Sequence, residues 1–146
     1  MNRAVIEFSS RAENVAFARV AVAAFVSQLD FTLSDLEEIK VAVSEAVSNA
    51  IVHGYGNDPN HMVRLELTIS GDYMEIEVID RGRGMEDVAR AMEPAYSTDP
   101  ERMGLGFAFM QSFMDKLSVE STPQKGTRVK MIRRAGVPRR AAVPEQ

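Results

Sequence analysis

Two polar residues four positions apart interrupt an otherwise apolar helical pattern in the first half of the chain. Glu45 and Asn49 lie within residues 34–52, where apolar side chains recur at helical spacing. Because residues four apart share one face of a helix, a carboxylate and a carboxamide stack there one turn apart. Such a pair can present an acid–base group beside an oxygen ligand for Mg²⁺. A solvated polar edge of the helix is the alternative interpretation.

A second candidate is a carboxylate at the end of a predicted strand. The alternation of residues 73–80 puts Asp80 on the core-facing side of this strand. A buried charge needs a partner, and the glycines that follow, Gly82 and Gly84, allow a flat or bulky group to approach the backbone closely. An Asp that only caps the turn after the strand is the alternative.

A third motif joins a polar loop to the start of an apolar helix. Gly104, Leu105 and Gly106 come directly before the apolar segment 107–114. Unpaired backbone N–H groups and the positive end of the helix dipole favour a phosphate at such a start. The preceding loop offers three further candidate phosphate contacts, which are Ser97, Thr98 and Arg102. A plain helix start is the alternative explanation of the glycines.

Two more polar residues lie at the ends of predicted elements. Thr127 follows Gly126 and shares a strand face with Val129, so its hydroxyl is predicted to face inward. A β-branched residue that merely fills the strand is the alternative. His53 lies at the end of the second helix, where we interpret it as a charge that interacts with the helix dipole rather than as a catalytic group.

The elements that must position these residues follow from hydrophobic periodicity and from turn and capping signals. Ser10 with Glu13, and Ser34 with Glu37, have the spacing of capping boxes. The order of elements, βααββααββ, predicts an α+β fold, a two-layer sandwich whose mostly antiparallel sheet is covered on one face by helices. The predicted elements are a strand over 4–8, helices over 10–29 and 34–52, strands over 63–69 and 73–80, helices over 86–93 and 104–116, and strands over 117–121 and 127–133.

Composition bounds the possible functions. The 146 residues suit one domain, predicted over 1–133, with a disordered basic tail over 134–146. The absence of cysteine excludes disulfides, Cys-ligated metal centres and thiol catalysis, and two histidines exclude a multi-histidine metal site. A net charge of −4 argues against a nucleic-acid binder. Without a predicted membrane span or a hydrophobic signal core, we expect a cytoplasmic protein with no membrane contact.

The order of the motifs is more specific than any single motif. ExxxN on a helix, DxGxG after a strand, GxG opening a helix and GT on a strand resemble the GHKL superfamily of ATPases and kinases, which has the Bergerat ATP-binding fold. Here they are Glu45 to Asn49, Asp80 to Gly84, Gly104 to Gly106, and Gly126 with Thr127. The segments FARVAVAAFVSQLD, EIKVAVSEAVSNAIVHGY and MGLGFAFMQSFMD also resemble the anti-sigma-F factors of endospore-forming bacteria, which are serine kinases.

The resemblance implies a role for each motif. ATP or ADP would bind with its adenine amino group donating to Asp80, supported by Thr127 and by Gly84. Asn49 would ligate Mg²⁺, and residues 92–104 would form a lid, with Arg102 and the amides of 104–106 near the phosphates. Glu45 would be the general base for a substrate serine.

The resemblance also implies partners. They are an RNA polymerase sigma factor of the sigma-F type, an anti-anti-sigma factor that is phosphorylated, and a second copy of the chain in a homodimer. The first strand and helix would make the dimer and sigma contacts, with Arg19 as a sigma contact.

Of three alternatives, two remain open. One is a general-stress anti-sigma kinase. Another is a module that binds ATP only as a structural ligand and sequesters a sigma factor without catalysis. The third, a histidine-kinase catalytic domain, would need a phospho-accepting helix and a dimerisation domain that these 146 residues do not hold.

Overall fold

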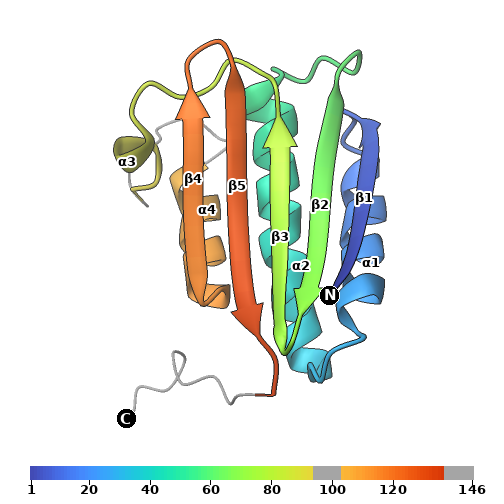
Figure 1. Ribbon diagram of the computed structural model, residues 1–146. Helices are drawn as coiled ribbons and strands as arrows, with labels where there is room; N and C mark the ends of the chain where they lie inside the picture. The colour runs from blue at the N-terminus through green and yellow to red at the C-terminus, as the bar shows by residue number, and fades with distance from the viewer. Residues whose placement is uncertain (94–102, 137–146) are drawn as a thin grey trace.

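The computed structural model describes residues 1–93 and 103–136, which form two layers (Figure 1). In chain order the elements are β1 (Asn2–Ser9), α1 (Asn14–Val26), α2 (Leu33–Asn49), the π-helix η1 (Ala50–Gly54), β2 (Met62–Ser70), β3 (Tyr73–Asp80), α3 (Val88–Ala91), α4 (Met103–Phe113), β4 (Lys116–Thr122) and β5 (Gly126–Arg134). The strands pair antiparallel in the order β1-β2-β3-β5-β4, and α1, α2 and α4 cover one face of this sheet. The predicted α+β sandwich is confirmed.

Alternation along the strands decides which side chains face the helices. In β3, Met74, Ile76 and Val78 belong to the buried core. Asp80 continues this face, and only 6% of its surface is exposed. The register of β3 with β5 sets Thr127 directly opposite Asp80. The strand pattern thus places a carboxylate at the end of the core, between the sheet and the helices.

The other face of the sheet is polar. Arg64 of β2 makes ion pairs with Glu7 of β1 and with Glu66 of its own strand. Farther along the sheet, Glu77 of β3 contacts Arg128 of β5. Opposite charges on neighbouring strands stabilise such a face while it remains solvated. Large apolar contact areas for a small ligand therefore lie on the helix side.

The first helix starts later than its capping signal predicts. α1 begins at Asn14, and its N-cap residue Glu13 makes no side-chain capping hydrogen bond. Ser10 is buried, and its backbone N–H donates to the carbonyl of His61 at 2.9 Å. The predicted capping box of Ser10 and Glu13 is wrong because the chain at Ser10 still pairs in line with the β1–β2 ladder and cannot begin a helix.

The capping box of α2 also differs from the prediction. Thr32 accepts a hydrogen bond from the N–H of Asp35 at 3.0 Å, and Asp35 accepts one from the N–H of Thr32 at 2.9 Å. The box of Ser34 and Glu37 is therefore wrong by two residues. Thr32 and Asp35 have the same reciprocal chemistry as Ser with Glu, so the spacing alone did not distinguish the two pairs.

The second predicted helix changes form before it ends. α2 ends at Asn49, and the chain continues as η1, in which the N–H of Tyr55 donates to the carbonyl of Ala50 at 3.0 Å. A π-turn of this kind is rare and is frequently found at functional sites. It brings Gly54 and Tyr55 against the chain that follows β3.

The last strand continues one residue past position 133, where the sequence predicts the domain to end. β5 extends to Arg134, and Ala135 is buried. Arg133 is fully buried and makes ion pairs with Asp35 and Glu38 of α2. Residues 137–146 of the predicted tail lie outside the described residues. Within residues 1–93 and 103–136, none of the helices has the length and hydropathy of a bilayer-spanning segment.

Candidate functional site

A cavity of about 320 Å³ lies at the upper end of the molecule in Figure 1, between the sheet and the helices. The end of α2, η1, the end of β3 and its following loop, α3, α4 and the start of β5 all contribute to its walls. This volume falls in the range of small-molecule sites, about 300–1,000 Å³. The fold therefore forms a ligand-sized site where several of the candidate residues meet.

Asp80 places a buried carboxylate in this cavity. Its Oδ1 accepts a hydrogen bond from the N–H of Gly82 at 2.9 Å, and the backbone N–H of Thr127 also donates to the carboxylate. Burial raises the pKa of Asp80 from 3.8 to about 6, although the two N–H donors lower it. At neutral pH the group is therefore largely ionised, and it retains acceptor capacity for a donor on a ligand.

Three glycines allow backbone segments to pack directly around Asp80. A Cβ added to Gly54 would lie 2.7 Å from the carboxyl carbon of Asp80. A Cβ at Gly82 would lie 1.9 Å from the carbonyl oxygen of Gly54, and one at Gly126 would lie 2.1 Å from that of Asp80. No larger residue fits these positions without displacing backbone or the carboxylate. Gly54 therefore packs directly on the carboxylate, whereas Gly82 packs on the backbone of Gly54 and Gly126 on the backbone of Asp80.

Gly84 has a different neighbour. Its φ of +70° is left-handed, and an added Cβ would lie 2.1 Å from the carbonyl oxygen of Thr122. Gly84 also lines the cavity. Its missing side chain therefore makes room for the β4–β5 hairpin, while its backbone forms part of the cavity wall.

Asn49 and Glu45 lie at the seam between α2 and α4. Asn49 lines the cavity, and its buried Nδ2 has no hydrogen-bond partner among the residues that the structure describes. One turn earlier, Glu45 faces α4 so closely that a Cβ at Gly106 would lie 2.8 Å from its Oε1. The pair thus packs against a neighbouring helix rather than forming a solvated edge.

The structure brings only part of the predicted set together. Asn49, Asp80, Gly84 and Thr127 line one cavity. Glu45 and Gly106 adjoin it without lining it, Gly82 packs on Gly54, and Gly104 and Leu105 lie in the first turn of α4. Ser97, Thr98 and Arg102 lie outside the described residues. The hydroxyl of Thr127 is 2.8 Å from Ser121 Oγ.

The residues that follow Asn49 belong to the site although sequence reasoning did not place them there. His53 lines the cavity, as does Gly54. The sequence interpretation of His53 as only a charge at a helix end did not predict that its side chain lines the cavity. His53 follows Asn49 by four residues, the spacing that also pairs Glu45 with Asn49, so helical periodicity could have found it.

The remaining lining combines apolar side chains with charged ones of both signs, the acidic ones being Glu86 and Asp87. Met85, Phe107 and Val129 supply apolar surface, and Arg83 and Arg90 supply positive charge. A flat, largely apolar ring with a hydrogen-bond donor and an attached anionic group would match this lining, because Asp80 accepts the donor and the arginines offset the anion.

Comparison with known proteins identifies the family of this chain. Residues 8–133 match the family described as histidine kinase-like ATPase domain. An RsbU–RsbW domain structure from Mycobacterium tuberculosis has a TM-score of 0.65 at 19% identity, covering 92% of this chain and 32% of that chain. At this identity the structural likeness shows the shared fold.

Sequence relatives are much closer. An anti-sigma F factor from Clostridium botulinum (strain Eklund 17B / Type B) is 49% identical over 132 residues, which cover 89% of this chain and 92% of that protein. An anti-sigma F factor from Pasteuria penetrans is 50% identical over 145 residues, 97% of each chain. Membership of the ATPase family implies ATP binding. The chain therefore belongs to the histidine kinase-like ATPase domain family and, within it, to the anti-sigma F factors.

Proposed function

We propose that this protein is an ATP-dependent serine kinase that binds a sigma factor of the sigma-F type and phosphorylates a serine of its anti-anti-sigma partner in sporulation. The buried carboxylate of Asp80, on which Gly54 packs directly, is the observation that carries the nucleotide part. The adenine amino group would donate to this carboxylate and offset the cost of its burial. Thr127 would support the ring through its hydroxyl, which already lies in a hydrogen-bond network with Ser121.

Asn49 fits the Mg²⁺ that accompanies a nucleotide. Its amide has a buried Nδ2 with no partner in the described chain, so the amide group can turn its oxygen toward the cavity. No three His, Asp or Glu side chains of the described residues group as a metal site. Mg²⁺ would therefore be held largely by phosphates and water, as it prefers, and when bound it would neutralise phosphate charge.

Glu45 is the proposed general base for the transfer. It would take the proton from the substrate serine as the serine Oγ bonds to the γ-phosphorus and the bond to the bridging oxygen of ADP breaks. The backbone amides of Gly104 to Gly106 lie in the first turn of α4 and would face the phosphates. Arg102, Ser97 and Thr98 are proposed as phosphate contacts on their sequence positions alone.

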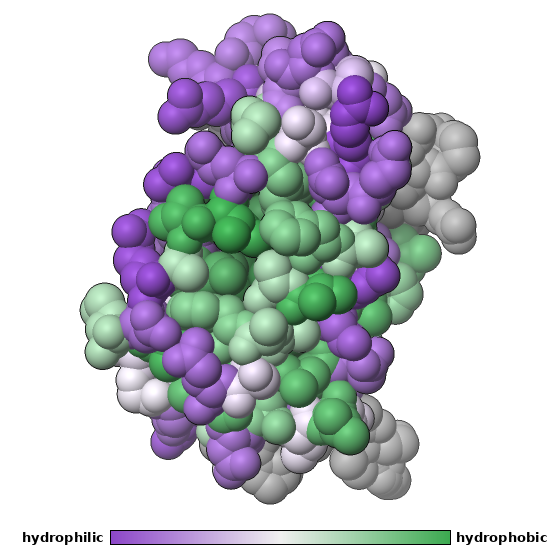
Figure 2. Space-filling view, turned by 90° about the vertical axis from the view of Figure 1, so that its right-hand side faces the viewer, coloured by the Kyte–Doolittle hydropathy of each residue, from purple (hydrophilic) through white to green (hydrophobic). Residues whose placement is uncertain are grey.

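An exposed apolar surface is the proposed site of homodimer contact. Phe17 and Val20 of α1 have exposed fractions of 53% and 63%, and Phe17 packs edge-on against Phe8 of β1. We call these two exposed residues the α1–β1 patch. Figure 2 views this edge of the molecule and shows apolar side chains gathered on it. Apolar patches on an otherwise polar surface mark protein interfaces. Beside it, Arg19 donates to Ser44 Oγ at 3.3 Å and is the proposed sigma contact.

Two related functions are also compatible with this fold. A general-stress anti-sigma kinase would keep this site and bind another sigma factor. A sequestering module would bind ATP without transferring phosphate. The position of Glu45 at the α2–α4 seam, one turn from Asn49, favours catalysis over sequestration alone.

A labelling experiment tests the proposal. The purified protein is mixed with Mg²⁺, γ-labelled ATP and a candidate anti-anti-sigma protein, and label on serine is measured. Glu45→Gln should bind ATP and lose transfer by at least about 100-fold, the usual effect of removing a general base. Glu37→Gln changes an exposed carboxylate on the same helix and should transfer normally. ATP binding without transfer by the wild type would favour the sequestering module, and no ATP binding would refute the proposal.

A further inference from the structure

The loop that follows Asp80 is fixed by hydrogen bonds to Gly54, the last residue of η1, and to Tyr55, the residue after it. The carbonyl of Gly54 accepts a hydrogen bond from the N–H of Arg83 at 2.9 Å. The hydroxyl of Tyr55 accepts one from the N–H of Arg81 at 2.7 Å. Both ends of the segment 81–83 are thus hydrogen-bonded to the end of η1 and the residue after it. Asp80, which carries the proposed base-binding carboxylate, directly precedes this segment.

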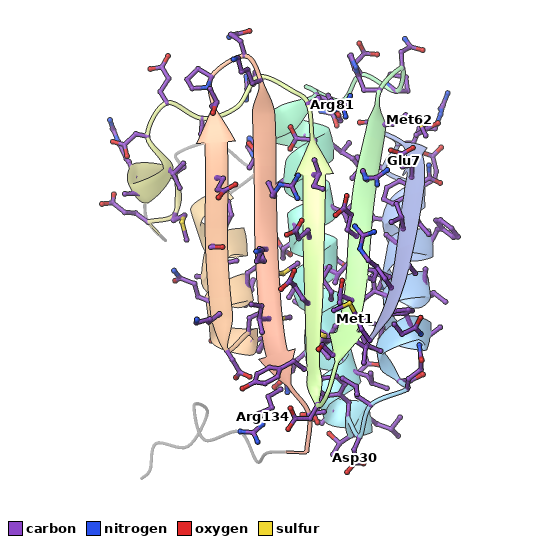
Figure 3. All side chains as sticks on the ribbon, in the orientation of Figure 1. Met1, Glu7, Asp30, Met62, Arg81 and Arg134 are labelled. Carbon is purple, nitrogen blue, oxygen red and sulfur yellow. The ribbon has the colours of Figure 1, made fainter. Side chains whose placement is uncertain are left out.

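The hydroxyl of Tyr55 makes a second bond that anchors it. It donates to the carbonyl of Met62, at the start of β2, at 2.7 Å. Figure 3 shows Met62, at the start of β2, and Arg81, directly after β3, at the same end of the sheet. One hydroxyl therefore bridges the start of β2 and the residue after β3, beyond the last β2–β3 pair of Arg64 and Ile79.

The ring of Tyr55 is fixed as well. It stacks on His61, with the ring centroids 4.6 Å apart and the planes inclined by 5°. Burial raises the pKa of Tyr55 above its ordinary value of 10.0, so the hydroxyl keeps its proton and can donate to Met62 at any physiological pH. A stacked ring with both hydroxyl bonds satisfied is a rigid support.

We infer that Tyr55 is a positioning residue for base recognition: its hydroxyl fixes the backbone at Arg81 and thereby aims the Asp80 carboxylate at the 6-amino group of adenine. This inference rests on the proposed nucleotide site. Tyr55 does not touch the nucleotide in this scheme, and it acts through Asp80. Its removal should therefore weaken the one ligand interaction that Asp80 makes, and leave contacts to ribose and phosphates unchanged.

The test compares two ligands in three proteins. The ligands are ATP and purine riboside 5′-triphosphate, which lacks only the 6-amino group. Tyr55→Phe removes the hydroxyl and keeps the stacked ring. Tyr73→Phe makes the same change at the exposed, opposite end of β3 and is the matched control. Dissociation constants are measured at a temperature well below the thermal midpoint of each protein, so that differences in global stability do not affect the measured affinities.

We expect Tyr55→Phe to weaken ATP binding about three- to tenfold, as the loss of one or two neutral hydrogen bonds predicts. Affinity for purine riboside triphosphate should change less than about twofold, and Tyr73→Phe should change neither affinity. An equal loss for both ligands, or an unchanged preference for ATP, would overturn the inference. A wild type that binds neither ligand, or binds both equally, would instead refute the proposed adenine site on which the inference rests.

A second measurement starts from the wild-type protein and can overturn the inference even if Tyr55→Phe does not fold. In the wild-type protein, the Arg81 amide should exchange its hydrogen slowly, as should the Arg83 amide, because both donate within the fold. Exchange of the Arg81 amide at the rate of an unprotected peptide would overturn the inference. Slow exchange of Arg81 that becomes fast when Tyr55 is changed would support it.

Discussion

Asp80 shows, at the scale of single residues, a conflict between stability and binding. The side chain is buried beside apolar neighbours, and burial raises its pKa to about 6. The folded protein therefore holds a proton on Asp80 more tightly than the unfolded chain, whose carboxyl titrates near 3.8. The ionised form that a base-binding site needs is the form that the fold tolerates least. A ligand donor would relieve this cost.

The corresponding prediction concerns the pH dependence of unfolding without nucleotide. Stability due to Asp80 falls as pH rises from 3.8 to about 6, by about 3 kcal/mol, and is level above that range. Asp80→Asn cannot titrate, so its free energy of unfolding relative to wild type should rise by this amount across the same range. Urea denaturation at several pH values measures the difference, and a difference that is independent of pH would contradict the assignment. The same variant should bind ATP more weakly.

At the scale of elements, the packing of α4 on α2 positions Glu45. Gly106 lies in the first turns of α4, and its missing side chain makes room for the carboxylate. The nearest atom is the end of a flexible side chain, so an added methyl group would displace the carboxylate rather than the helix. Gly106→Ala should leave the free energy of unfolding unchanged or raise it by up to about 1 kcal/mol, because alanine favours helix.

The same variant should lose phosphoryl transfer. A general base must lie within hydrogen-bond reach of the hydroxyl, and a displaced Glu45 would not. We expect Gly106→Ala to retain ATP binding and to transfer label at least about tenfold more slowly. Single-turnover labelling with saturating ATP checks this. Normal transfer would show that Glu45 needs no support from α4.

Another element-scale contact lies at the opposite end of the helices. Arg133 of β5 donates to Glu38 at 2.9 Å and to Asp35 at 2.6 Å, both on α2, and to the carbonyl of Phe113 at the end of α4 at 2.9 Å. One buried side chain thus joins two helices to the sheet. It holds the ends of α2 and α4 that lie away from the cavity.

Removal of Arg133 should be costly for stability. Arg133→Met leaves two carboxylates without their cation in a half-buried region and should lower the free energy of unfolding by about 3–5 kcal/mol. Arg134→Met is the matched control, because Arg134 is an exposed neighbour that pairs with Asp72. It should change stability little. Chemical denaturation of both variants checks the prediction, and equal effects would contradict it.

The whole molecule presents two unlike surfaces. The open face of the sheet carries paired charges, whereas the α1–β1 edge carries the α1–β1 patch. β1 is also an edge strand of the sheet. An apolar patch beside an unpaired strand edge is a natural place for a second chain to dock.

If the proposed homodimer forms through the α1–β1 patch, Phe17→Glu should shift it to monomer. A charge in the middle of an apolar contact cannot be buried without a partner. Phe109→Glu, the same change at an exposed phenylalanine of α4, should leave the dimer intact. Sedimentation equilibrium over a range of concentrations measures both. A Phe17→Glu protein that remains dimeric would place the dimer contact elsewhere.

Short-range patterns were sufficient for much of the fold. Alternation along residues 73–80 identified the buried face of β3, including Asp80, because side chains of a strand point to opposite faces in turn. Capping was less well determined. Ser34 with Glu37 and Thr32 with Asp35 offer nearly the same hydrogen bonds, and Asp35 also contacts Arg133, almost a hundred residues away in sequence. A local sequence pattern cannot predict a contact between residues so far apart in the chain.

By itself, the sequence determined the two layers, the order of the elements and the residues that carry the motifs, because periodicity and turn chemistry act over a few residues. The tertiary structure alone decided which of these residues meet. It inserted β5 between β3 and β4, brought His53 into the cavity, set Gly54 against Asp80 and buried Arg133. These arrangements depend on close packing and hydrogen bonds between segments far apart in the chain, which a local pattern does not contain.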